Sequence, residues 1–274
     1  MPRLRPSALT SWVVLAGRSR ARCRSSASPP AAPCSPCSAR GALLTAAGLI
    51  AISALITAAG LRTHPPRATG RAGVAATWRV DRELLGSPAA RPLLLAAWVP
   101  NGLIVGAEAM YVPYAGATAG VLFMAGAAGM LLGDLVVGRW VPAAARERLA
   151  SPLQALLAVP YLLFVLRPGP VVAAVAVFVA SAGYGGTLGL QQRLLRVIPA
   201  RLTGQAIGLE GSGRMTWQAL GAAAVGAVAE LTGAATAMTV AGLASLLVTA
   251  ALWRPLGQNR KSAPVARRIS QTLP

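Results

Sequence analysis

The sequence predicts an all-α, polytopic membrane protein with about seven transmembrane helices. The 274 residues are 55% hydrophobic and only 12% charged, whereas soluble domains contain about 25% charged residues. Their mean hydropathy is +0.57. Apolar runs long enough to cross a bilayer recur along the chain. Arg-rich turns alternate with almost uncharged ones, which is typical of helical hairpins oriented by the positive-inside rule.

The net charge of +19 raises binding to nucleic acid as an alternative. The arginines fall between apolar spans and do not line one soluble face, so membrane orientation explains them better and we expect no nucleic-acid partner. Cys34 and Cys37 form a C-x-x-C without a second ligand pair, and His64 stands alone beside two prolines. We therefore predict no metal and no cofactor. Hydrolase, zinc-peptidase and phosphate-loop motifs are absent from the sequence, so we predict no enzyme.

The first 92 residues comprise a basic segment, an apolar span and a second basic segment. Residues 1–40 hold seven arginines among Ser, Pro and Cys, and we predict a disordered or non-native N-terminal segment. Residues 41–61 carry no charge and predict the first transmembrane helix. Residues 62–92 are polar and basic, which indicates a cytoplasmic linker with a short surface helix around 78–85.

Residues 93–255 predict six further spans, at 93–115, 119–141, 150–166, 170–190, 204–231 and 234–253, followed by a basic cytoplasmic tail at 256–274. Taken in order, the loops on one side hold six, three, three and five Arg or Lys, whereas the other side holds only Arg167. This bias predicts three hairpins in the cell membrane with the C-terminus in the cytoplasm. It also places the seven arginines of 1–40 outside, which the same rule opposes. Either upstream spans are missing, or residues 1–40 are not what normally precedes this helix.

One stretch between the third and fourth spans carries a spaced set of small and charged residues. Its members are Gly129, Gly133, Asp134, Gly138 and Arg139. Glycines allow close approach of helices, and an acid that looks buried at the cytoplasmic edge can pair with a nearby arginine. A plain topogenic loop is the alternative interpretation.

With this motif, the order of one helix, a basic linker and three hairpins resembles the C-terminal half of a major facilitator superfamily (MFS) transporter over residues 41–255. The Gly of the family's loop motif usually follows the Asp by three residues, whereas Gly138 follows Asp134 by four. Pro199, Gly204 and Gly208 entering the sixth span also resemble this superfamily, as does an acid near its outer end, Glu230. The resemblance implies that 41–61 corresponds to helix six, that the later spans correspond to helices seven to twelve, and that Asp134 and Arg139 gate conformational switching. By analogy, the bacterial drug-efflux branch is the most similar.

Several polar residues fall inside predicted spans, where ionised groups are costly. Helical spacing places Asn101, Glu108 and Tyr111 on one face, unless Glu108 merely reaches the outer headgroups. Glu210 and Arg214 have the i to i+4 order of an ion pair, with Trp217 continuing that face. This pair either serves transport or only holds helix packing. Tyr184 and Gln191 are a further candidate pair, although the surrounding glycines favour packing.

Two sets of residues predict packing and anchoring instead. The Ala/Gly stretch from Gly221 to Gly226 predicts helix contact. Trp98, Trp140 and Trp253 lie near the edges of spans, where tryptophan anchors helices at the headgroups.

The leading functional hypothesis is secondary active transport of a small molecule, with proton-coupled efflux by alternating access. Its partners would be the lipid bilayer, a small-molecule substrate and protons. The alternative is a truncated, non-transporting fragment, or a half-transporter that needs a partner chain in place of the N-terminal half.

Overall fold

The computed structural model describes residues 36–60 and 73–258, and all of its regular elements in those ranges are helices. The prediction of an all-α chain is thereby confirmed. Cys34, His64, the basic residues of 1–35 and the tail beyond residue 258 lie outside the described residues.

Helix α2 (Pro36–Gly60) forms a unit of its own. It begins five residues before the predicted start, so the last residues of the predicted disordered segment are helical. Its apolar side chains are exposed along its length; Leu44, Ile50 and Leu55 are each about 70% exposed. Such a surface is stable only in a bilayer or against another apolar surface.

The second unit contains the remaining helices. In chain order they are α3 (Val74–Gly86), α4 (Arg91–Glu108), α5 (Tyr111–Ala115), η1 (Gly116–Thr118), α6 (Ala119–Arg139), α7 (Ala143–Ala158), η2 (Val159–Leu166), α8 (Pro170–Ala182), η3 (Gly183–Gly185), α9 (Gly186–Val197), η4 (Ala200–Leu202), α10 (Thr203–Thr232) and α11 (Ala234–Gln258). The predicted surface helix around 78–85 is α3. The predicted span 170–190 extends through α9 to Val197 without a break in helical structure.

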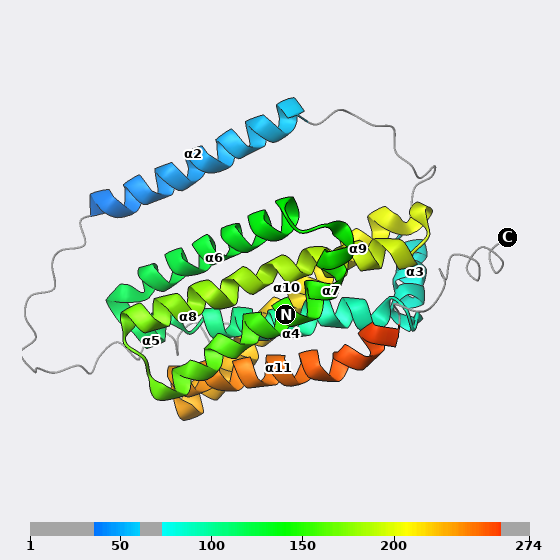
Figure 1. Ribbon diagram of the computed structural model, residues 1–274. Helices are drawn as coiled ribbons and strands as arrows, with labels where there is room; N and C mark the ends of the chain where they lie inside the picture. Colours follow the sequence, from blue (N-terminus) through cyan, green and yellow to red (C-terminus); the bar gives the residue numbers. More distant parts are fainter. Residues whose placement is uncertain (1–35, 61–72, 259–274) are drawn as a thin grey trace, which may run out of the picture. The chain divides into compact units, whose positions relative to one another are not determined.

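Helix α4 is central to this unit, where it packs against α10 and α11, while α6 packs against α8 and α7 against α9 (Figure 1). The contact between α4 and α10 depends on glycine. A Cβ on Gly102 would collide with the carbonyl of Trp217, and one on Gly221 would collide with the carbonyl of Gly102. Small residues therefore let the two backbones touch, as the sequence predicted for Gly221. Gly226 has nothing within 4 Å of such a Cβ, so its predicted packing role is wrong for this unit.

Five helical stretches are long and apolar enough to cross a membrane: Leu43–Gly60, Arg91–Arg139, Ala143–Leu166, Pro170–Val197 and Ala234–Trp253. The chain is thus compatible with a multi-pass membrane protein, whereas the predicted number of seven spans is not confirmed. The difference has two sources. Arg91–Arg139 includes two predicted spans, α4 and α6, and α10 is not among the five, although it has 30 residues.

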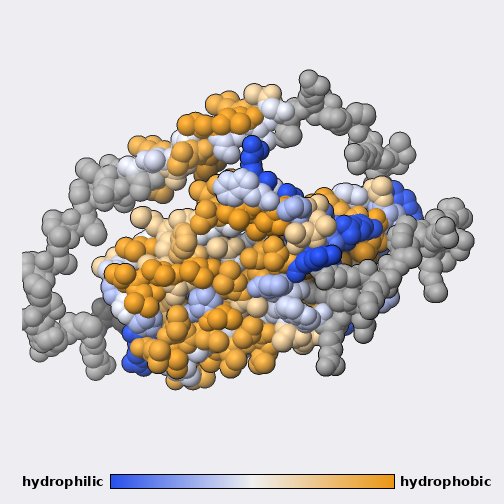
Figure 2. Space-filling model, viewed as in Figure 1, coloured by the Kyte–Doolittle hydropathy of each residue, from blue (hydrophilic) through white to orange (hydrophobic). Residues whose placement is uncertain are grey.

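The face of the molecule seen in Figure 2 is mostly apolar, with hydrophilic side chains gathered toward the end of the bundle where α3 and α9 lie. Large apolar residues such as Met124, Leu131 and Val171 are more than 60% exposed on α6 and α8. An exposed apolar surface this extensive on long helices is the expected lipid-facing surface of a membrane bundle.

Candidate functional site

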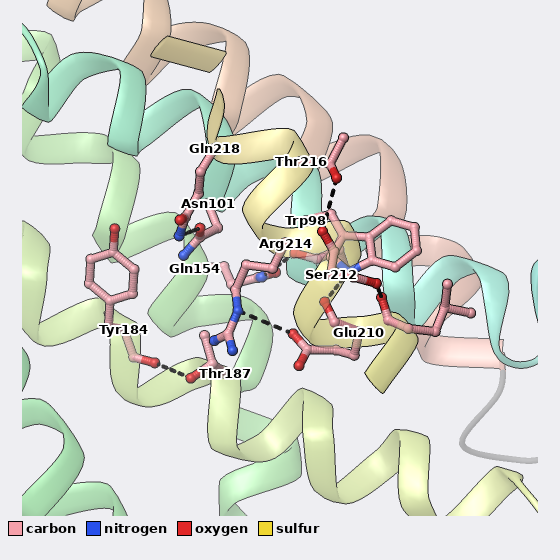
Figure 3. A network of polar contacts seen from close by, with 12 residues as sticks. Trp98, Asn101, Gln154, Tyr184, Thr187, Glu210, Ser212, Arg214, Thr216 and Gln218 are labelled. Carbon is pink, nitrogen blue, oxygen red and sulfur yellow. Dashed lines mark hydrogen bonds and ion pairs between the residues drawn. The ribbon is translucent and has the colours of Figure 1, made fainter. Parts of the chain in front are cut away.

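Helix α10 carries a charge pair inside the bundle, as the sequence predicted. Arg214 Nε lies 3.6 Å from Glu210 Oε1. Glu210 is only 6% exposed, whereas about a third of the Arg214 side chain is exposed. Figure 3 shows the guanidinium of Arg214 directed toward the Glu210 carboxylate. A carboxylate this buried in an apolar bundle needs its cation nearby, because an unpaired charge there is costly.

Trp98 fixes the backbone beneath this pair. Its indole Nε1 donates a 2.9 Å hydrogen bond to the carbonyl of Glu210, and its ring lies where a Cβ on Gly213 would be. Trp98 is 5% exposed. The prediction that it anchors a helix at the headgroups is therefore wrong, whereas Trp140 and Trp253 are exposed as that prediction requires.

A small cavity of about 30 Å³ lies beside the charge pair. Helix α4 contributes Leu93 and Ala97 to its wall, α9 contributes Thr187, Leu190, Gln191 and Leu194, and α10 contributes Glu210 and Arg214. The structure thus brings Gln191 together with the pair. This volume has room for about one water molecule and is far below the several hundred Å³ of a typical drug-sized pocket. In this conformation the site fits a proton or a water, and it excludes a drug-sized substrate.

The Nε of Arg214 lacks a hydrogen-bond partner in the described residues. This nitrogen is buried, and its distance to Glu210 is too long for a hydrogen bond. Buried donors normally have partners, and an unpaired one is destabilising. The pair is therefore not fully satisfied by its own helix.

The other predicted site residues, two on α4 and one on α5, have three different partners. Asn101, 3% exposed, accepts a 2.8 Å hydrogen bond from Gln218 of α10. Glu108 accepts a 3.3 Å hydrogen bond from the hydroxyl of Tyr184 in η3. The Tyr111 hydroxyl lies 2.6 Å from that of Tyr161 in η2.

Asn101 and Glu108 therefore connect α4 to α10 and η3, whereas Tyr111 connects α5 to η2. The three side chains have separate partners, although the sequence predicted that they share one face. Trp217, the last predicted residue of α10, is half-buried against apolar residues around Trp98. A further cavity of about 550 Å³ lies at the other end of the bundle beside Tyr114, Arg167 and Gly233. None of the predicted site residues lines it.

Pro100 explains a contact that the sequence analysis missed. Proline has no N–H, so the carbonyl of Ala96 loses its normal partner within α4. Gln154 of α7 replaces that partner, because its Nε2 donates a 2.5 Å hydrogen bond to the Ala96 oxygen. The amide oxygen of Gln154 is buried and has no partner among the described residues. The proline in α4 was visible in the sequence, but the residue that compensates for it was not.

The glycine-rich motif of α6 is partly as predicted. A Cβ on Gly129 or Gly133 would collide with the carbonyls of Phe178 or Ala182 in α8, so both glycines serve close helix packing. Asp134 and Arg139, however, are exposed, and the structure gives no ion pair between them in the part of the chain that it describes. The expectation of a buried Asp134 is wrong because it faces outward from the α6–α8 contact.

A different arginine satisfies the end of α6. Arg146 donates from Nη2 to the carbonyl of Gly138 at 2.6 Å and from Nε to the carbonyl of Val141 at 2.8 Å. These carbonyls lie where a helix leaves its last acceptors unsatisfied. Nearby, Arg196 of α9 forms an ion pair with the buried Glu147 of α7. Neither contact was predicted, because sequence spacing does not reveal which helices meet.

In the described ranges, no group of three or more His, Cys, Asp or Glu side chains is placed to hold a metal ion. Comparisons of the chain with protein-family models, with curated proteins and with solved structures find no match. The resemblance to the MFS therefore stays a prediction from the sequence.

Proposed function

We propose that this chain is a secondary active transporter of a small molecule, with an MFS-like C-terminal bundle that couples efflux to protons in the cell membrane. The observation that carries the proposal is the Glu210–Arg214 pair, buried between α4, α9 and α10 beside a cavity of about 30 Å³. Ionisable groups inside apolar bundles are costly, so they mark ion and substrate pathways.

The roles within this proposal follow from the contacts. Glu210 would exchange a proton, since its carboxylate borders a cavity of the size of a water molecule. Arg214 would stabilise the charged form and lose this contact when Glu210 is protonated. Glu108 with Tyr184 would form a second proton-accepting position nearer the other end of α4. The C-terminus would lie in the cytoplasm, because the exposed arginines gather at that end.

Ethidium uptake by inside-out vesicles tests the proposal. Vesicles from cells that produce the full chain are acidified inside by respiration, and ethidium fluorescence is followed before and after a protonophore. We expect protonophore-sensitive uptake by the wild type and none by vesicles without the chain. Glu210→Gln and Glu108→Gln should abolish the uptake, because neither amide exchanges a proton at neutral pH. Their membrane levels are compared with those of the wild type.

Glu230→Gln is the matched control, since Glu230 is exposed on the same helix as Glu210. It makes the same change of charge without touching the cavity, so uptake should be retained. Wild-type vesicles without protonophore-sensitive uptake would contradict efflux of a lipophilic cation. Full uptake by Glu210→Gln would contradict the coupling role of the pair.

The open face of α10 favours the alternative, a half-transporter that needs a partner chain. Gly204, Gly208 and Gly211 follow one another at spacings of four and three residues, and a Cβ on any of them would have nothing within 4 Å. Stripes of small residues normally mark close helix contacts, yet this stripe has no neighbour in the described unit. Extraction of the full chain from its membrane in polymer-bounded lipid discs, followed by mass measurement, separates the two proposals. A disc that contains a second polypeptide supports the half-transporter, and a single 27.8 kDa chain contradicts it.

A further inference from the structure

Helix α3 lies across the end of the bundle. In Figure 1 it runs transverse to α6, α8 and α11, at the end where α4 begins. Two contacts fix it there. The side chain of Gln205 in α10 donates a 2.9 Å hydrogen bond to the carbonyl of Thr77. Leu84 is 3% exposed and packs into the apolar cluster of α4 and α9, with Val80 beside it.

The outward side of α3 carries an apolar stripe that the bundle does not cover. Val74, Trp78 and Leu85 are 89%, 66% and 39% exposed. Their spacing of four and seven residues places them on one side of a helix with 3.6 residues per turn. The same geometry puts Arg82 on one flank of the stripe, the half-buried Asp81 on the other, and Glu83 on the far side of the helix. The apolar stripe therefore adjoins a cation.

The end of the bundle beneath α3 is strongly cationic. Besides Arg79 and Arg82 of α3, the exposed arginines at this end are Arg91, Arg139, Arg148, Arg196 and Arg201. The acids at this end, within the described ranges, are the exposed Glu83 and Asp134 and the half-buried Asp81, and Glu147 is buried against Arg196. At the other end, Arg167 and Glu230 are exposed with opposite charges. Among the described residues of this unit, the excess positive charge therefore lies at the end that carries α3.

We propose that α3 and the surrounding arginines bind anionic phospholipid headgroups at the membrane surface. A transverse helix with an apolar stripe beside arginines has the geometry of an interfacial helix, whose apolar side enters the headgroup region. Tryptophan prefers this depth, and guanidinium groups bind phosphate oxygens through paired hydrogen bonds. Trp78 would thus reach the acyl boundary while Arg79 and Arg82 contact lipid phosphates. This inference does not depend on transport.

Quenching of Trp78 by brominated lipids tests the lipid contact. The full chain is reconstituted in phosphatidylcholine bilayers that contain a minor fraction of either brominated phosphatidylcholine or brominated phosphatidylglycerol. The contribution of Trp78 is the difference between the wild type and Trp78→Phe, which preserves an aromatic side chain at an exposed position. We expect this contribution to be quenched by both lipids, and at lower mole fraction by the anionic one.

Variants of the arginines test the charge. A cation near an anionic surface is worth about a fivefold change in lipid partition, so Arg79→Gln with Arg82→Gln should reduce the preference for phosphatidylglycerol at least severalfold. Arg167→Gln is the control and is compared with each single variant, Arg79→Gln and Arg82→Gln. It removes one positive charge at the opposite end of the bundle and should leave the preference unchanged.

Three results would overturn the proposal. If Trp78 is not quenched by either lipid, its face is covered by another polypeptide or a second copy of the chain. Equal quenching by the two lipids would show that no anionic headgroup is selected. An equal loss of preference in Arg167→Gln would show that the effect comes from net charge and not from α3.

Discussion

The close contact between α4 and α10 gives the sharpest test of the packing. We consider Gly221→Ala, since a Cβ on Gly221 would collide with the carbonyl of Gly102. The obstacle is a backbone atom within a helix, so a rotamer change cannot relieve the clash and the helices must separate. Overpacking of this kind costs about 1–3 kcal/mol, and the fixed position of the obstacle favours the upper part of that range.

Helix propensity acts in the opposite direction and must be subtracted. Alanine in place of glycine favours a helix interior by roughly 0.8–1 kcal/mol. The net destabilisation by Gly221→Ala is therefore about 2 kcal/mol, and the midpoint of thermal unfolding should fall by roughly 4–8 °C for a unit of this size. Gly226→Ala in the same helix meets nothing within 4 Å. It should keep only the propensity gain and raise the midpoint by about 2–4 °C.

Thermal unfolding of the purified full chain in one detergent, followed by circular dichroism at 222 nm, measures both variants. The difference between them is the informative quantity, because detergent shifts the two midpoints alike. If Gly221→Ala and Gly226→Ala have equal midpoints, the backbones of α4 and α10 do not touch at this position and the packing described here is wrong.

Two further predictions concern buried hydrogen bonds and use the same unfolding measurement. Gln154→Leu should cost about 1–3 kcal/mol, because it leaves the Ala96 carbonyl buried without a donor. Pro100→Ala restores the N–H that can pair with the Ala96 carbonyl within α4. In that background, Gln154→Leu should cost at least about 0.5 kcal/mol less. Equal costs in both backgrounds would show that Gln154 does not replace the hydrogen bond that Pro100 removes. Tyr111→Phe should destabilise the protein by about 1–3 kcal/mol, because it leaves the fully buried Tyr161 hydroxyl without a hydrogen-bond partner. The double variant with Tyr161→Phe should be less destabilised than Tyr111→Phe alone. Additive losses would contradict a hydrogen bond between the two hydroxyls.

The sequence was sufficient to predict some limits of the helices in the second unit, because apolar length and loop charge are local signals. It missed the start of α7 at Ala143 and the end of α9 at Val197. The turn at Gly116–Thr118 and the ends of α6, α10 and α11 lie within five residues of the predicted limits. The count of spans was less predictable. Helix α10 is long enough to cross a bilayer, yet Gln205, Glu210, Arg214 and Gln218 lower its hydropathy, so length and hydropathy disagree for it.

The polar contacts of the candidate site were only partly predictable. Glu210 and Arg214 were found because an i to i+4 pair lies within one helix. The partners of Glu108 and Asn101 lie 76 and 117 residues away, and such distant contacts depend on how helices rotate against one another. The prediction of a buried Asp134 failed because it also depended on how a helix rotates against its neighbour. The position of Asp134 at the end of a glycine-rich helix suggested burial, but Gly129 and Gly133 turn the opposite side of α6 toward α8.

The arrangement of bonds around α4 suggests how a change at Glu210 would be transmitted. Trp98 of α4 holds the Glu210 carbonyl, and two residues further along the helix Pro100 interrupts the bonding of α4 at Ala96. A helix is most easily bent where a proline has removed a hydrogen bond. Loss of the contact between Glu210 and Arg214 would therefore act on α4 next to its weakest point. Gln154 of α7 donates to the freed Ala96 carbonyl in this conformation. The proposed proton site on α10 thus contacts α4 at Trp98, two residues before the proline. A ligand or proton that shifts this contact can couple to helix movement only if two conformations of α4 bind it differently.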